Sequence, residues 1–163
     1  MTLLIAQTAW LIPLYPLLAA VASLAWSPGL IWRTGPRPCG YLNLLMVSVA
    51  FVHSVLALIG LLSNAAAGAS ALYKPLTFGW TWLSTAGLSI GFEGIITEPA
   101  LIAMTVITGL HVLTQIFAIG YLEMDWGWPR FFGCLSFFEA GLCGLVLTDS
   151  LFFSYVILEL LTL

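Results

Sequence analysis

Residues 149–163 read D-S-L-F-F-S-Y-V-I-L-E-L-L-T-L, an almost unbroken apolar segment that holds one carboxylate, Glu159. Its composition predicts a membrane helix with this carboxylate near the middle of the bilayer. A charged side chain there costs about 2.5–3.5 kcal/mol, whereas each neighbouring Leu, Ile, Val or Phe contributes only about 0.3–0.6 kcal/mol to insertion. The neighbours can hold Glu159 in the membrane but supply no reason for its presence. We therefore interpret Glu159 as a functional residue that handles protons.

The composition of the whole chain is that of a membrane protein. Its 163 residues are 61% hydrophobic and 7% charged, against about 25% charged residues in soluble domains. With a net charge of −3 and four basic residues, the chain lacks the basic surface of a nucleic-acid-binding protein. Its cysteines form no CxxC motif and no Cys/His cluster, so we predict buried free thiols at Cys39, Cys134 and Cys143 and no metal site.

The apolar runs predict an all-α membrane protein with a small β-hairpin. Five helices are expected in one transmembrane domain covering residues 1–163, at about residues 3–26, 41–62, 99–122, 131–147 and 149–163. Residues 76–96 or so alternate apolar or aromatic residues with small or polar ones on either side of Gly87. This period of two predicts a hairpin on the membrane face.

Two further features concern how the chain sits in the membrane. The fifth predicted helix is too short for a hydrocarbon core of about 30 Å, so we expect the sequence to be the front part of a longer protein. Arg33, Arg37 and Arg130 all fall on the side reached after the first and third predicted spans. The positive-inside rule then predicts that this side is cytoplasmic and that the N-terminus faces outward.

A polar stripe marks the third predicted helix. Thr108, His111 and Gln115 are spaced i, i+3 and i+7, which places them on one helix face. Such a face meets neighbouring helices or trapped water rather than lipid. Two interpretations stay open: hydrogen bonds between helices, or part of a hydrated proton path in which an imidazole takes and releases protons near neutral pH.

The other polar residues of the predicted spans are not equally strong candidates for a functional role. Glu159 shares a helix face with Tyr155 and Thr162, whose hydroxyls could orient its carboxyl group or hold a water beside it. A protonated, purely structural glutamate is the alternative, and the functional reading is favoured because neutral residues fill a structural role without the charging penalty. Glu139 is a weaker candidate, and His53, alone among apolar residues on its face, is predicted to be a satisfied core histidine.

The third span and everything after it resemble a known family. This part contains G-Y-L-E-M-D at 120–125, R-F-F at 130–132, L-S-F-F at 135–138 and L-V-L at 145–147, then the helix with Glu159. In order and spacing it resembles the large antiporter-like subunit of complex I-type NAD(P)H:quinone oxidoreductases, specifically subunit 5 of the photosynthetic complex in cyanobacteria and plastids. W-L-I-P-L-Y-P-L-L at 10–18 is similar to that family's first span, and the hairpin running into T-E-P-A-L at 97–101 is similar to its outer-face hairpin.

The resemblance implies a function and a set of partners. Subunits of this family are long helical membrane proteins that move protons, coupled to quinone reduction elsewhere in the complex. Their fifth-helix glutamate, which aligns with Glu159, pairs with a lysine on a later helix, and that lysine would lie beyond Leu163. The chain itself would hold no cofactor, with plastoquinone and iron–sulfur clusters elsewhere in the complex. The implied partners are lipid and other membrane subunits, especially a neighbouring antiporter-like subunit, in a cyanobacterial thylakoid with the N-terminus on the lumenal side.

Two departures from the family pattern stand out. The family commonly has W-E-x-V-G around the glutamate, and this chain has L-E-L-L-T at 158–162. A family histidine on the third helix aligns with Gln115, and His111 lies one turn earlier. These departures resemble the divergent subunit 5 of the cyanobacterial CO2-uptake form, which docks a zinc-bearing CO2-hydration protein. No zinc ligand is implied for this chain.

The leading hypothesis is a proton-translocating subunit, with Glu159 as the proton-transfer carboxylate and His111 and Gln115 lining a water path. One alternative is the large subunit of a multi-subunit cation/proton antiporter, in which sodium exchange replaces quinone-linked pumping. Another is a non-pumping scaffold that docks a CO2-hydration protein. A structural, lipid-embedded subunit is the third, and the intramembrane carboxylate makes it less attractive.

Overall fold

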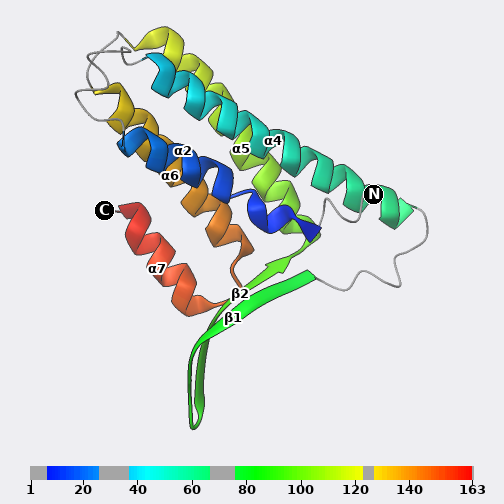
Figure 1. Ribbon diagram of the computed structural model, residues 1–163. Helices are drawn as coiled ribbons and strands as arrows, with labels where there is room; N and C mark the ends of the chain where they lie inside the picture. Colours follow the sequence, from blue (N-terminus) through cyan, green and yellow to red (C-terminus); the bar gives the residue numbers. More distant parts are fainter. Residues whose placement is uncertain (1–6, 26–36, 67–75, 123–126, 163) are drawn as a thin grey trace.

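The computed structural model describes residues 7–25, 37–66, 76–122 and 127–162, and Arg33 lies outside these ranges. Four helices form an antiparallel bundle, α7 packs on α6, and the hairpin projects from one end (Figure 1). The predicted fold class, a helical membrane protein with a small β-hairpin, is confirmed. In chain order the elements are the 3-10 helix η1 (Ala9–Leu11), α2 (Leu14–Leu24), α4 (Arg37–Ala66), β1 (Leu76–Thr85), β2 (Leu88–Ile96), α5 (Glu98–Tyr121), α6 (Trp128–Leu147) and α7 (Leu151–Thr162).

Three of the described helices are long and apolar enough to cross a membrane. They comprise Arg37–Ser63 of α4, Glu98–Tyr121 and Trp128–Leu147. The apolar segments Ala9–Leu24 and Leu151–Thr162 are shorter. Among the described helices, α4, α5 and α6 therefore have the length to carry a hydrogen-bonded backbone through a hydrocarbon layer.

Prolines explain where the helices differ from the sequence-based bounds. The first predicted span is broken, since η1 ends at Leu11 and α2 begins at Leu14, after Pro13. α4 and α6 instead begin earlier than predicted, with Pro38 and Pro129 inside their first turns. A first-turn amide has no partner within the helix, so a proline there starts a helix, although the same residue breaks one further along.

Many small side chains lie in the bundle interior beside larger ones such as Phe132 and Met104, and many large apolar side chains point outward. Buried positions include Ala50, Ala57, Ala118 and Ala140, while Leu110, Leu113 and Phe117 of α5 are exposed on the outside of the described chain. Small residues let helix backbones approach closely, which is how helices associate in a lipid solvent. This arrangement brings the polar side chains of four helices within reach of one another.

The hairpin has a two-residue connection at Ala86–Gly87, between Thr85 and Leu88. Gly87 adopts a φ of +100°, a conformation that residues with a Cβ rarely adopt. The strands pair in antiparallel register from Leu76↔Ile96 to Thr85↔Leu88, with one register shift between Thr81 and Leu83. The period-two pattern around Gly87 thus identified the hairpin correctly.

The hairpin is attached to the bundle at the turn between α6 and α7. The amide of Asp149 donates to the carbonyl oxygen of Glu93 at 2.9 Å, and Gly94 forms an isolated antiparallel bridge with Thr148. The rings of Phe92 and Phe153 meet edge to face, with centroids 4.9 Å apart. These contacts link β2 to the beginning of α7, the helix that carries Glu159.

Gly94 allows this attachment because a Cβ there would overlap the ring of Phe78, which packs against the core. We predict that Gly94→Ala displaces Phe78 and weakens hairpin docking by about 1–3 kcal/mol. Limited proteolysis of the hairpin in membrane vesicles should then be faster than in wild type. Gly120→Ala is the matched control, because nothing lies within 4 Å of a Cβ at Gly120; equal protection of both variants would contradict the prediction.

Gly141 and Gly144 of α6 lie beneath α7. A Cβ at Gly141 would overlap the side chain of Leu161, and one at Gly144 would lie 3.6 Å from Ile157. We predict that Gly141→Val pushes α7 away from α6 and lowers stability by about 1–3 kcal/mol. The measurement is the thermal midpoint of the solubilised protein, compared with Gly120→Val. A midpoint that falls no further for Gly141→Val than for the control would refute the close approach.

Candidate functional site

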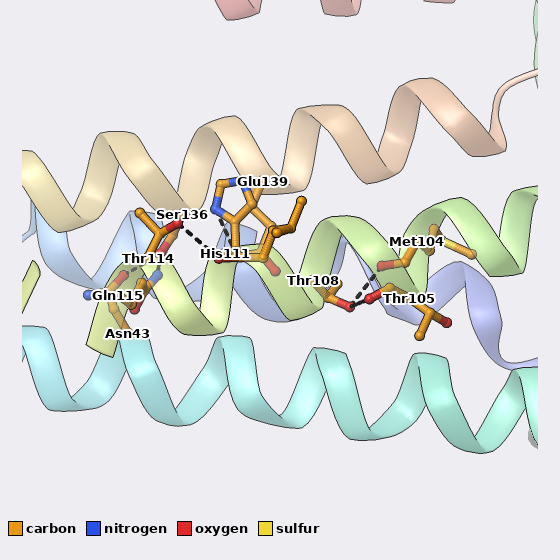
Figure 2. Close-up of polar contacts among 10 residues, drawn as sticks. Asn43, Met104, Thr105, Thr108, His111, Thr114, Gln115, Ser136 and Glu139 are labelled. Atoms are coloured by element: carbon orange, nitrogen blue, oxygen red, sulfur yellow. Dashed lines mark hydrogen bonds and ion pairs between the residues drawn. The ribbon is translucent and has the colours of Figure 1, made fainter. Parts of the chain in front are cut away.

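The polar stripe of α5 faces the interior of the bundle, as the sequence predicted. Thr108 and Gln115 are fully buried and His111 is 9% exposed. Figure 2 shows these residues in a row along the bundle, from Gln115 and Asn43 at one end, through His111 and Glu139, to Thr108. At that last position, the Thr108 hydroxyl lies 3.1 Å from the Ser54 hydroxyl of α4. The stripe therefore contacts α4 and α6 and does not face the outside of the bundle.

One set of hydrogen bonds joins all four bundle helices. Gln115 Nε2 donates to Ser136 Oγ of α6 at 3.1 Å, and Ser136 Oγ donates to Asn43 Oδ1 of α4 at 2.7 Å. Asn43 Nδ2 donates to Ser23 Oγ of α2, and Ser23 Oγ donates to the carbonyl oxygen of Ala19 at 2.7 Å. Each member donates to the next, so the row has one direction and ends on a backbone acceptor. We call these side chains, Gln115, Ser136, Asn43 and Ser23, the amide–hydroxyl row.

A second contact between α5 and α6 lies one turn from the first. His111 Nδ1 is 3.8 Å from Glu139 Oε2, and Glu139 is fully buried. Glu139 follows Ser136 by three residues and His111 precedes Gln115 by four, so the two contacts form successive rungs between the antiparallel helices. The ring of Phe138 lies 6.1 Å from that of His111, centroid to centroid.

Four polar atoms of these rungs are buried without a hydrogen-bond partner in the described structure. They are His111 Nδ1, Gln115 Oε1 and both carboxylate oxygens of Glu139. A buried polar atom left unpaired costs about 1–3 kcal/mol, and more when the group is charged. Four unpaired polar atoms close together in an apolar bundle favour a functional site over a purely structural contact.

The site residues that the sequence predicted on the last helix lie apart from this interior site. Glu159, Tyr155 and Thr162 are all exposed on α7. The Thr162 hydroxyl donates to the backbone carbonyl oxygen of Glu159 at 2.9 Å, not to its carboxyl group. The structure thus separates the predicted site residues into an interior group, His111 and Gln115, and the α7 group.

His53 has polar partners, as the sequence predicted, but it is only half-buried and therefore not the core residue that was expected. Its Nε2 lies 3.1 Å from Thr8 Oγ1 and its Nδ1 lies 3.3 Å from Tyr15 Oη. Of the predicted buried thiols, Cys39 and Cys143 are buried, but Cys134 is exposed. The prediction was wrong for Cys134, because this residue lines an open groove between α6, the end of α2 and α7. Among the described residues, no group of three or more metal-ligating side chains could hold a metal ion.

Sequence reasoning missed the partners of the stripe. Asn43 and Ser136 were not singled out, and Glu139 was ranked below Glu159. A signal was present, because Ser136 and Glu139 share one face of α6 at i and i+3 in an otherwise apolar helix. Reading α6 as a polar stripe facing that of α5 would have paired the two helices.

Comparison with known proteins finds similarity to one family along the chain. The family described as NADH-Ubiquinone oxidoreductase (complex I), chain 5 N-terminus, matches residues 82–132. NAD(P)H-quinone oxidoreductase subunit 5 of the organellar chromatophore of Paulinella chromatophora is 44% identical over 157 residues, which cover 96% of this chain and 24% of that protein. The chloroplast subunit 5 of Anthoceros angustus is 30% identical, with 96% of this chain and 21% of that protein covered.

The corresponding chloroplast protein of Hordeum vulgare is 32% identical over 157 residues, with 94% of this chain and 20% of that protein covered. The chain thus spans a quarter or less of the length of these curated relatives. Similarity extends along nearly all of the chain and includes both the hairpin and the two helices that carry the rungs. The chain is therefore similar over nearly all of its length to NAD(P)H-quinone oxidoreductase subunit 5, and the matched family description assigns residues 82–132 to the N-terminal part of complex I chain 5.

Proposed function

We propose that the chain is part of a proton-translocating, antiporter-like subunit of a quinone-reducing enzyme of the complex I type. The observation that carries the proposal is the buried polar interior of the bundle, where titratable and hydrogen-bonding side chains lie among span-length apolar helices. Groups of this kind are costly in a membrane and mark proton or ion paths. Similarity to subunit 5 supports the same assignment.

In this proposal the chain supplies proton-handling side chains and no redox chemistry. Glu159 accepts and releases a proton, Tyr155 orients its carboxyl group, and His111 and Gln115 line a water path through the bundle. The expected orienting role of Thr162 is not kept, because its hydroxyl donates to the backbone carbonyl oxygen of Glu159. Plastoquinone and the iron–sulfur clusters belong to other subunits of the complex. The partners are neighbouring membrane subunits, one of them antiporter-like, in a thylakoid membrane with the N-terminus of this chain on the lumenal side.

A carboxylate on α7 suits this role because its neighbours are apolar. A charged side chain is costly in apolar surroundings, so a functional carboxylate there calls for an opposite charge nearby. A lysine from a later part of the full-length protein would provide such a charge, as the family resemblance implies. Glu159 is also exposed on the described chain, and therefore open to contact by such a partner.

The first test replaces Glu159 in the intact complex. Glu159→Gln keeps the shape of the side chain but cannot change its charge, so we expect proton translocation through this subunit to slow by roughly 100-fold, a typical effect of removing a proton-transfer group. The measurement is the number of protons moved per electron in membrane vesicles, with assembly checked on native gels. Glu98→Gln, which alters an exposed carboxylate at the first turn of α5, is the control. Wild-type translocation by an assembled Glu159→Gln complex would refute the role.

A more specific form of the proposal assigns the chain to the complex that is coupled to CO2 uptake. The motivation is the sequence L-E-L-L-T at 158–162, which departs from the usual family pattern around the glutamate. A CO2-hydration protein should then co-purify with the complex, and Glu159→Gln should lower CO2 uptake in cells. If the partner co-purifies and Glu159→Gln leaves CO2 uptake intact, the subunit acts as a docking scaffold. Sodium-dependent transport without quinone reduction would instead indicate a cation/proton antiporter.

A further inference from the structure

The proposed function gives Glu139 no role and lets His111 only line a water path, although the two residues form a buried titratable pair. His111 and Glu139 lie between α5 and α6, with 3.8 Å between Nδ1 and Oε2 and with no hydrogen bond to either atom in the described structure. We propose that His111 and Glu139 share one proton and form a second proton-holding site inside the bundle, separate from Glu159. This inference rests on the proposed function and extends it to a new pair of residues.

The charges around the pair require it to retain a proton. Arg37 and Arg130, the arginines of the described chain, are exposed in the first turns of α4 and α6, away from the middle of the bundle. His111 is therefore the cation nearest to Glu139 among the described residues. A lone carboxylate in an apolar interior is strongly disfavoured. The pair thus keeps one proton in either of two forms, a carboxylic acid beside a neutral imidazole or a carboxylate beside an imidazolium.

Interconversion of these forms moves one proton over a short distance. The imidazolium gives its Nδ1 proton to Oε2 of Glu139, which leaves a neutral imidazole and a carboxylic acid, and the net charge of the pair does not change. The separation of 3.8 Å exceeds the 2.7–3.2 Å of an N–H···O hydrogen bond. A small side-chain rotation or an intervening water would close this gap.

The neighbouring rung supplies an acceptor for such a water. Gln115 donates through Nε2 to Ser136, so its Oε1 is free to accept. Side chains one helical turn apart are separated by about 5–6 Å, a distance that one water covers with two hydrogen bonds. The amide–hydroxyl row does not carry protons itself, because amides do not titrate; it fixes the orientation of Gln115 beside the pair.

Other titratable groups of the bundle leave the pair isolated. His53 of α4 contacts Thr8 and Tyr15 on another face. Cys143, one turn beyond Glu139 on α6, is a buried thiol and provides no positive charge. On the α5 side the next polar group is the hydroxyl of Thr108, which donates to the carbonyl oxygen of Met104 at 2.8 Å. Among the described residues, the polar groups of the two rungs are therefore the neighbours with which the pair can exchange its proton, directly or through water.

The experiment compares variants of the pair in the intact complex. Glu139→Gln keeps the size and hydrogen-bonding capacity of the side chain but removes its titration, so assembly should be normal. Protons moved per electron should fall, with transfer through this site slowed by roughly 10-fold or more. Glu139→Asp, which still titrates, should restore part of the transfer. An infrared difference spectrum between the resting and reduced complex should contain a carboxyl band that shifts in deuterium oxide, disappears in Glu139→Gln and changes in His111→Gln.

The outcomes separate this inference from the proposed function. If Glu159→Gln stops translocation while Glu139→Gln translocates normally and keeps the carboxyl band, the second site does not exist and the proposed function stands. If both variants translocate normally, both proposals fail. Loss of translocation and of the band in Glu139→Gln, with partial return in Glu139→Asp, supports the second site. Glu98→Gln is again the control, and the deuterium shift of the band in wild type and in His111→Gln tests the pair even if Glu139→Gln does not assemble.

Discussion

The bundle depends on pairing polar side chains with one another inside an apolar protein. Gln115, Ser136, Asn43 and Ser23 come from four different helices, and each donates to the next until the row ends on the carbonyl oxygen of Ala19. Because an amide or hydroxyl without a partner is costly in such surroundings, the row fixes the relative register of α2, α4, α5 and α6. Small residues at the helix contacts allow the approach on which these hydrogen bonds depend.

The rung formed by His111 and Glu139 follows from the same register. Once Gln115 is held against Ser136, the spacing of four residues on α5 and of three on α6 brings the histidine opposite the carboxylate. The first rung satisfies its donors, whereas the second leaves the carboxylate and the imidazole nitrogen without partners. A hydrogen-bonded contact thus lies beside one without hydrogen bonds, a combination typical of sites where protonation changes.

The hairpin connects the bundle to the last helix. Its second strand contacts the turn that precedes α7, through Asp149 and Thr148, and an aromatic contact joins Phe92 to Phe153. On the other side of α7, Gly141 and Gly144 of α6 permit a close approach. The position of Glu159 is therefore determined at two places, by the strand at the beginning of its helix and by α6 along its length.

The sequence by itself determined the class of the protein, the position of the hairpin turn at Gly87 and the inward direction of Thr108, His111 and Gln115. These features depend on composition and on the spacing of apolar and polar residues, with a period of two in strands and 3.6 in helices. Both can be recognised within a short stretch of sequence. Only the tertiary structure decided that Gln115 meets Ser136, that Glu139 faces His111 and that Glu159 lies apart from both. The reason is physical: which residues of two helices meet depends on their relative register and rotation, and these are set by close packing and hydrogen bonds among residues up to 93 positions apart.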